Sequence, residues 1–179
     1  DRFRRCQQRN FDAQAVELAQ KAFGVNAACA KNLGSERDQT FMLLDGSGAG
    51  LTVMKVSNPA EDPSTLDMEA LGVLHIRRAD PDLPVAIPWL VPGSDSADDP
   101  MVYRTPLEHD GVTNWVPMYD VLPGTGRGRA ATLSDDAVAA WGETTARLGR
   151  ALRGFFHPKA QRTMLWDVQH ALRCRSMLS

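Results

Sequence analysis

The first regular pattern along the chain is helical. Between residues 12 and 23, apolar side chains recur at intervals of three and four positions, which places them on one face of a helix. Asp12 stands where an N-cap is expected, and Gly24 stands where a glycine commonly ends a helix. The pattern therefore predicts a helix over 12–23.

Short apolar segments separated by turn residues come next. Segments 26–32, 40–45 and 51–56 have strand character, with a polar turn between the first two and a run of glycines before the third. Because this run leads into a strand and not into a helix, we interpret it as a turn rather than a dinucleotide-binding motif. Three consecutive antiparallel strands fit these segments best.

A second helical pattern begins after the third strand. Asp62 is placed to cap a helix that has Pro63 in its first turn. Over 62–77 one face of this helix is apolar, with Leu66, Ala70, Val73 and Leu74. Beyond it, closely spaced prolines allow only a short strand at 86–91, and 102–107 and 115–122 are predicted to be the last two strands.

The remainder of the chain is predicted to be helical. Glycine and polar residues indicate a linker over 125–133. From a cap at Ser134, apolar residues alternate by three and four positions as far as Phe155, and a further helix is predicted through Met164 toward Leu172.

Together these elements predict an α+β fold. It consists of a helix, a five-stranded antiparallel sheet with one helix inserted after the third strand, a linker, and then helices only. This is the order of a protein-kinase-like N-lobe, over 1–124, that enters the first helices of a C-lobe, over 134–179. Other α+β domains are compatible with the same order.

Composition narrows the range of partners. A formal net charge of −2 gives no electrostatic basis for binding nucleic acid or a membrane surface, and no apolar run is long enough to span a bilayer. The three cysteines are far apart in the sequence and odd in number, which suggests neither a disulfide framework nor a metal cluster. The four histidines lack the spacing of a zinc site. We therefore expect a cytoplasmic protein with no metal site in this chain.

Three sequence segments carry a family resemblance. They are Asn-Leu-Gly-Ser-Glu-Arg-Asp-Gln at 32–39, Val-Met-Lys-Val-Ser-Asn-Pro-Ala-Glu-Asp at 53–62, and Leu-Trp-Asp at 165–167. In combination they resemble the aminoglycoside phosphotransferase family, and most closely its hydroxylysine-kinase-like domains, some of which are fused to class III aminotransferases. The resemblance implies a kinase-like fold and an ATP or GTP donor, with Mg²⁺ in the full-length enzyme. It also implies a small-molecule acceptor hydroxyl, on an amino alcohol, a hydroxylated amino acid or an aminoglycoside-like compound.

Lys55 is the first candidate binding residue. On a strand it shares a face with Leu51 and Val53, where an unpaired charge would be costly to bury. A strand-end lysine that extends its ammonium to water is the structural alternative. The resemblance aligns Lys55 with the strand-three lysine that contacts nucleotide phosphates. Its acidic partner would be Glu69 or Asp67, between which the helical wheel does not choose; the family register favours Glu69.

Two further segments are candidates for contact with the nucleotide. The turn at 34–38 offers backbone amides and the Ser35 hydroxyl to phosphate oxygens, although a plain hairpin explains it equally well. Segment 116–124 resembles the strand and hinge that bind the adenine through main-chain groups, which places Met118, Asp120 and Val121 near the base.

The residues that would catalyse transfer are missing from this chain. The family supplies them through a His-Gly-Asp loop and a later aspartate, and neither segment occurs in this sequence. We assign no catalytic residue and expect an N-terminal fragment of a longer phosphotransferase, with exposed apolar surface on its helical part that favours a homodimer. The alternatives are a non-catalytic nucleotide-binding or interaction module, and an unrelated α+β domain in which Lys55 is merely buried.

Overall fold

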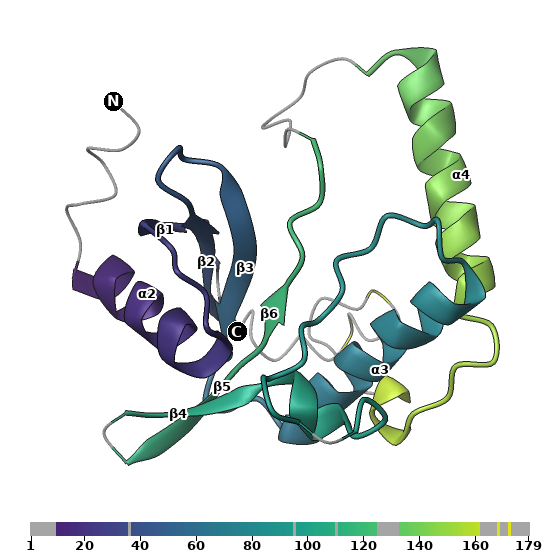
Figure 1. Cartoon of the computed structure of the whole chain (residues 1–179). Helices are drawn as coiled ribbons and strands as arrows, with labels where there is room; N and C mark the ends of the chain where they lie inside the picture. The colour runs from purple at the N-terminus through teal and green to yellow at the C-terminus, as the bar shows by residue number, and fades with distance from the viewer. Residues whose placement is uncertain are drawn as a thin grey trace.

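The computed structural model describes residues 10–35, 37–94, 96–109, 111–124 and 133–161, together with Val168 and Leu172. It contains an antiparallel sheet, as the sequence predicts, and helices lie on both sides of this sheet (Figure 1). In chain order the elements are α2 (Asn10–Phe23), β1 (Cys29–Asn32), β2 (Gln39–Leu44), β3 (Gly50–Val56), α3 (Pro63–Ala79), the short 3₁₀ helix η1 (Pro100–Tyr103), β4 (Thr105–His109), β5 (Val112–Val116), β6 (Met118–Tyr119), α4 (Asp135–Ala151) and the 3₁₀ helix η2 (Pro158–Gln161).

Helix α2 covers one face of the sheet. Its buried residues pack with Ala27, before β1, and with inward-facing residues of β1, β2, β3, β5 and β6 in one apolar cluster, formed by Ala15, Ala19, Phe23, Ala27, Ala30, Phe41, Leu43, Met54, Val116 and Met118. The helix ends as predicted, because Gly24 adopts a φ of 69° that other residues rarely reach. Asp12 does not cap it, since the helix begins at Asn10 and Asp12 therefore lies inside its first turn.

The main sheet has four antiparallel strands in the order β1-β2-β3-β6. Phe41 lies opposite Met54, and Thr40 lies opposite Lys55. Because side chains alternate along a strand, Phe41 and Met54 face α2 while Thr40 and Lys55 face the other side. The candidate binding lysine is thus on the face that α2 leaves open.

The prediction of a single five-stranded sheet is wrong in its strand count. Strands β4 and β5 form a separate hairpin, and the predicted strand at 115–122 is divided between β5 and β6. Pro117 lies at the division, and it has no N–H to donate to a neighbouring strand. Its carbonyl still accepts a hydrogen bond from the backbone N–H of Lys55 (3.1 Å), so the hairpin remains joined to the end of β3.

Prolines also account for the other two differences between the predicted and observed strands. Segment 86–91 forms only an isolated bridge, between Pro88 and Tyr119. Residues 100–103 form η1, capped by Asp99, so β4 starts at Thr105 rather than at 102. Its Pro106 is tolerated because β4 pairs on one side only, with β5.

Helix α3 begins as predicted, and of its predicted apolar face Leu66 and Ala70 are buried while Val73 and Leu74 are partly exposed. Asp62 caps it by accepting a hydrogen bond from Ser64 N (2.9 Å), and Pro63 occupies its first position. Leu66 and Ala70 are buried, and they line a small cavity together with Pro117 and Tyr119. These contacts place α3 beside β6, on the side of the sheet away from α2 (Figure 1).

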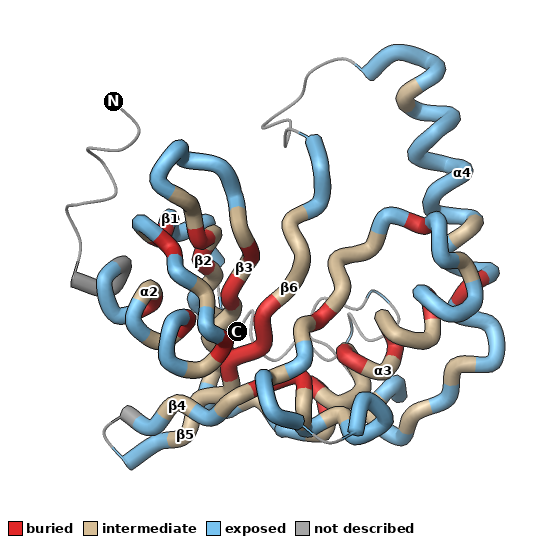
Figure 2. Tube along the Cα trace, in the orientation of Figure 1, coloured by how far each residue is buried: buried red, intermediate tan, exposed pale blue. Residues whose placement is uncertain are grey.

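Helix α4 is capped by Ser134 as predicted, but it ends at Ala151 and not near Phe155. Most of the helix is exposed along its length (Figure 2), and its apolar side chains include Trp141, 67% exposed, and Val138, 54% exposed. This confirms the predicted exposed apolar surface. Most of the predicted 125–133 linker and nearly all of the helix predicted through Met164 lie outside the described residues.

Within the described part of the chain, no helix is both long enough and apolar enough to cross a bilayer.

The packing of the α2 face yields a first prediction. Leu43 is fully buried, so Leu43→Ala leaves a cavity and should lower the free energy of unfolding by about 3 kcal/mol. Leu33→Ala, at a position 43% exposed, is the matched control and should change it by less than about 0.5 kcal/mol. Urea unfolding followed by tryptophan fluorescence measures both, and equal effects would contradict the assignment of the core.

A second prediction concerns the attachment of α4. Arg147 donates two hydrogen bonds to the Asp80 carboxylate (2.8 and 2.6 Å), and this holds the pKa of Asp80 below its ordinary value. The contribution of this pair to stability is therefore present above about pH 4 and is lost as the pH falls through the lowered pKa. Asp80→Asn should increase amide hydrogen exchange in α4 at neutral pH, whereas Asp82→Asn should not. Unchanged exchange in Asp80→Asn would show that the pair does not hold the helix.

Candidate nucleotide-binding site

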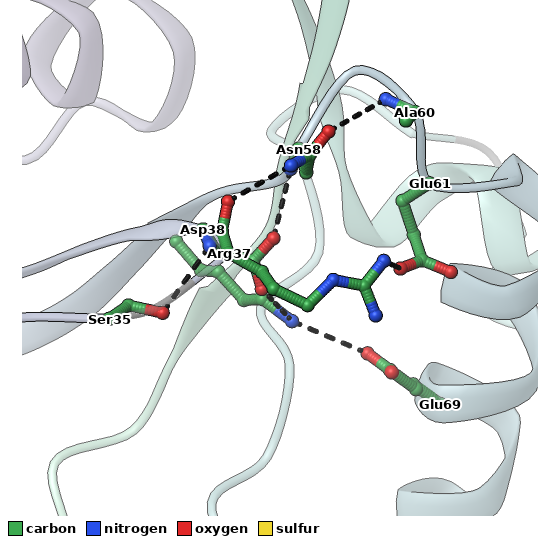
Figure 3. Close-up of polar contacts among 8 residues, drawn as sticks. Ser35, Arg37, Asp38, Asn58, Ala60, Glu61 and Glu69 are labelled. Carbon is green, nitrogen blue, oxygen red and sulfur yellow. Dashed lines mark hydrogen bonds and ion pairs between the residues drawn. The ribbon is translucent and has the colours of Figure 1, made fainter. Parts of the chain in front are cut away.

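Lys55 lies between two carboxylates that come from different elements. Its Nζ is 3.1 Å from Asp38 Oδ2, in the turn before β2, and 3.6 Å from Glu69 Oε2, on α3. Figure 3 shows these two carboxylates together with the polar contacts around the turn. The Lys55 side chain is 25% exposed, so its charge is paired while it stays accessible from solvent.

The structure distinguishes the two acidic candidates on α3. Asp67 forms an ion pair with Arg104, whose side chain is 2% exposed and lies over the Trp115 ring at 5.0 Å from its centroid. Asp67 is therefore directed toward the β4–β5 hairpin, while Glu69 reaches Lys55. The predicted Lys55–Glu69 ion pair is present, and its part in nucleotide binding stays a prediction.

Sequence reasoning missed Asp38 as a partner of Lys55. Thr40 lies opposite Lys55 in the β2–β3 register, and Asp38 is two residues before Thr40. Residues two apart on a strand share a face, and diagonal cross-strand neighbours lie within reach of a long side chain. Pairing the two predicted strands in register would therefore have identified this contact.

The 34–38 turn is tied to the 58–61 loop. The backbone N–H of Asn58 donates to Asp38 Oδ1 (2.9 Å), and the Asn58 side-chain amide donates to the carbonyl of Arg37 (3.2 Å). Asn58 Oδ1 accepts from Ala60 N (2.9 Å), and Arg37 pairs with Glu61 (3.1 Å). Two of the segments that carry the family resemblance thus contact each other directly (Figure 3).

Ser35 has a local role in this turn. Its hydroxyl accepts a hydrogen bond from Asp38 N (3.3 Å), and the residue is exposed. The preceding Gly34 adopts a φ of 75°, and its N–H donates to Asn32 Oδ1 (2.7 Å). This geometry fits a closed hairpin turn; contact of Ser35 with phosphate stays a prediction.

The three hinge residues lie in different environments. Met118 lies opposite Met54 and is fully buried, so its side chain points away from Lys55 and any contact with a base would be made by its backbone. The Asp120 carboxylate accepts a hydrogen bond from Trp89 Nε1 (2.8 Å). Val121 packs over Gly50, where an added Cβ would lie 3.4 Å from a Val121 methyl group.

Tyr119 is a second residue that sequence reasoning missed. It lies opposite Val53 and so shares the face of Lys55. Burial, together with the nearby carboxylates of Glu69 and Asp38, raises the pKa of Tyr119, and the phenol therefore remains protonated at neutral pH. Because side chains alternate along a strand and Met118 was predicted on this strand, Tyr119 could have been predicted on the opposite face from Met118.

The described residues do not form a metal centre. Among them, no group of three or more His, Cys, Asp or Glu side chains is arranged to hold a metal ion.

Comparison with known proteins shows the fold. No family model matches the sequence, and no curated protein matches it. The structure of the microcompartment-associated aminopropanol kinase is similar, with a TM-score of 0.60 and 19% identity, over 89% of this chain and 46% of that one. The amicoumacin kinase hAmiN in complex with AMP-PNP, Ca²⁺ and Ami is also similar, with a TM-score of 0.58 and 11% identity, over 92% of this chain and 47% of that one. The predicted kinase-like α+β fold is confirmed, and the chain spans about half the length of these kinases.

A third prediction tests the link between the turn and the loop. Asn58→Ala removes two side-chain hydrogen bonds, to Arg37 and Ala60, but keeps the backbone N–H that Asp38 accepts. At about 1 kcal/mol for each lost hydrogen bond, amide exchange of residues 37 and 38 should accelerate by about tenfold or more. Asn26→Ala, at an exposed position outside this network, is the control. Unchanged exchange at residues 37 and 38 would mean that the contacts do not order the turn.

Proposed function

We propose that this chain is the nucleotide-binding part of a small-molecule kinase of the aminoglycoside phosphotransferase family. The full-length enzyme would transfer the γ-phosphate of ATP or GTP to a hydroxyl group of a small molecule. The observation that carries the proposal is the ion pair between Lys55 on β3 and Glu69 on α3, in a chain whose fold is that of small-molecule kinases. In phosphoryl transfer, a lysine held in this way places positive charge on the phosphates of the donor.

The remaining site residues fit the same function. With the ammonium of Lys55 on the phosphates, Glu69 would keep the Lys55 side chain directed toward them. The 34–38 turn, including Ser35, would cover the phosphates with backbone amides and a hydroxyl. Backbone groups of Met118, Asp120 and Val121 would lie at the edge of the base, and Tyr119 would form part of the wall beside Lys55.

Transfer itself requires groups that this sequence lacks. An aspartate has to orient the acceptor hydroxyl, and Mg²⁺ neutralises the charge of the phosphates when it is bound. We propose that the aspartate and the metal ligands belong to the rest of the enzyme, in keeping with a chain that covers under half of each similar kinase. An aminopropanol kinase among these structures favours an amino alcohol or a hydroxylated amine as the acceptor.

The fourth prediction tests this function. The 179-residue chain should bind ATP weakly and show no turnover, because this proposal places the catalytic aspartate and the metal ligands in the rest of the enzyme. Lys55→Ala should weaken ATP binding by roughly thirtyfold, which corresponds to about 2 kcal/mol for a lost charged hydrogen bond. NMR titration measures millimolar affinities, and Lys31→Ala, exposed on β1, is the control.

Full-length protein serves as the positive control for turnover, assayed with a panel of amino alcohols, hydroxylysine and aminoglycosides. Acceptor-dependent turnover by the 179-residue chain that persists in Lys55→Ala would contradict both the proposed function and the role of Lys55.

A further inference from the structure

The nearer of the two carboxylates at Lys55 comes from the turn and not from α3. Asp38 Oδ2 lies 3.1 Å from the ammonium nitrogen, compared with 3.6 Å for Glu69 Oε2. One ammonium and two carboxylates give this cluster a formal charge of minus one. A phosphate group that approaches Lys55 would therefore meet a carboxylate already in contact with the ammonium.

Asp38 is held by its other oxygen as well. Its Oδ1 accepts the backbone N–H of Asn58 (2.9 Å), and its own N–H donates to the Ser35 hydroxyl (3.3 Å). Because the contacts with Lys55 and with Asn58 use different oxygens, Oδ2 can separate from Lys55 while Oδ1 keeps its hydrogen bond. Figure 3 shows the Asp38 carboxylate and its contact with Asn58.

Asp38 is also enclosed by the fold and is not a freely exposed side chain. Its side chain is 19% exposed, and that of Lys55 is 25% exposed. Charges in such partly buried positions are screened less by solvent and salt than those on an open surface. Repulsion between Asp38 and a phosphate should therefore lower the measured affinity for ligands that carry phosphates.

We propose that Asp38 occupies the phosphate position on Lys55 and competes with the nucleotide for it. The inference rests on the proposed function and adds a regulatory element to the same site. Asp38 lowers the affinity for ligands that carry phosphates and leaves the affinity for an uncharged nucleoside unchanged. A carboxylate that only positioned Lys55 would have the opposite effect, because its removal would weaken phosphate binding.

Asp38→Asn separates these two roles. The asparagine keeps the volume and an oxygen that can accept the Asn58 N–H, but it carries no charge. We would titrate the ¹⁵N-labelled 179-residue chain with ATP, inorganic tripolyphosphate and adenosine, and follow the amide signals of the 35–38 turn and Asn58. Asp38→Asn should bind ATP and tripolyphosphate about fivefold more tightly than the unmodified chain does, which corresponds to about 1 kcal/mol. Adenosine binding should not change.

Two controls make the result specific. Asp45→Asn causes the same change in net charge at the opposite end of β2, and it should leave all three affinities unchanged. In a Lys55→Ala background, Asp38→Asn should tighten binding by less than it does in the unmodified chain, because the competition for the ammonium is lost and only the direct repulsion between Asp38 and a phosphate remains. A dispersed amide spectrum like that of the unmodified chain confirms that each variant is folded.

The outcomes distinguish the inference from the proposed function. If Lys55→Ala weakens ATP binding while Asp38→Asn weakens it or leaves it unchanged, the competition is disproved and the proposed function stands. If neither the unmodified chain nor Asp38→Asn shows ATP binding that depends on Lys55, the proposed function and this inference both fail. Tighter binding of ATP and tripolyphosphate, but not of adenosine, in Asp38→Asn alone supports the inference.

Discussion

The placement of Lys55 between Asp38 and Glu69 is the interaction on which the rest of the account depends. A lysine on the open face of a sheet needs a compensating charge, and here the charges come from a turn and from a helix distant in sequence. Lys55 can contact both carboxylates only because the β1–β2 turn and α3 are both positioned beside β3. Under the proposed function, the same three elements would surround the phosphates of the bound nucleotide.

The surrounding contacts fix this arrangement. Asn58 holds the turn through its backbone and side chain, and the buried Arg104 holds Asp67 on α3, two residues before Glu69. A buried ion pair stabilises a protein little in net terms, because desolvation offsets the attraction. We therefore interpret the Arg104–Asp67 pair as a contact that orients α3.

Some ends of the helices depend on neighbouring residues and could be predicted from the sequence. The choice of ion-pair partners and the pairing of the last strands depend on contacts between distant residues and could not be predicted from local patterns. The cap at Asp62 and the end of α2 at Gly24 depend on neighbouring residues, so both were predictable. Lys55 pairs with Glu69 and not with Asp67, because Asp67 forms an ion pair with Arg104. Arg104 lies far along the chain, so a helical wheel of α3 could not predict this choice. The contact between Asp38 and Lys55 can be predicted only from the register of β2 on β3. The predicted last strand is divided at Pro117 because proline has no backbone N–H to donate, and the effect of this missing donor depends on the neighbouring strand.

Covalent labelling of the phosphate-contacting lysine tests the central claim most directly. An ATP analogue with a reactive acyl group on its terminal phosphate transfers that group to a lysine beside the phosphates, and mass spectrometry of the digested chain identifies the residue. We predict that Lys55 is the labelled lysine and that excess ATP prevents its labelling. Labelling spread over exposed lysines such as Lys21 and Lys31, with no protection by ATP, would contradict a nucleotide site at Lys55.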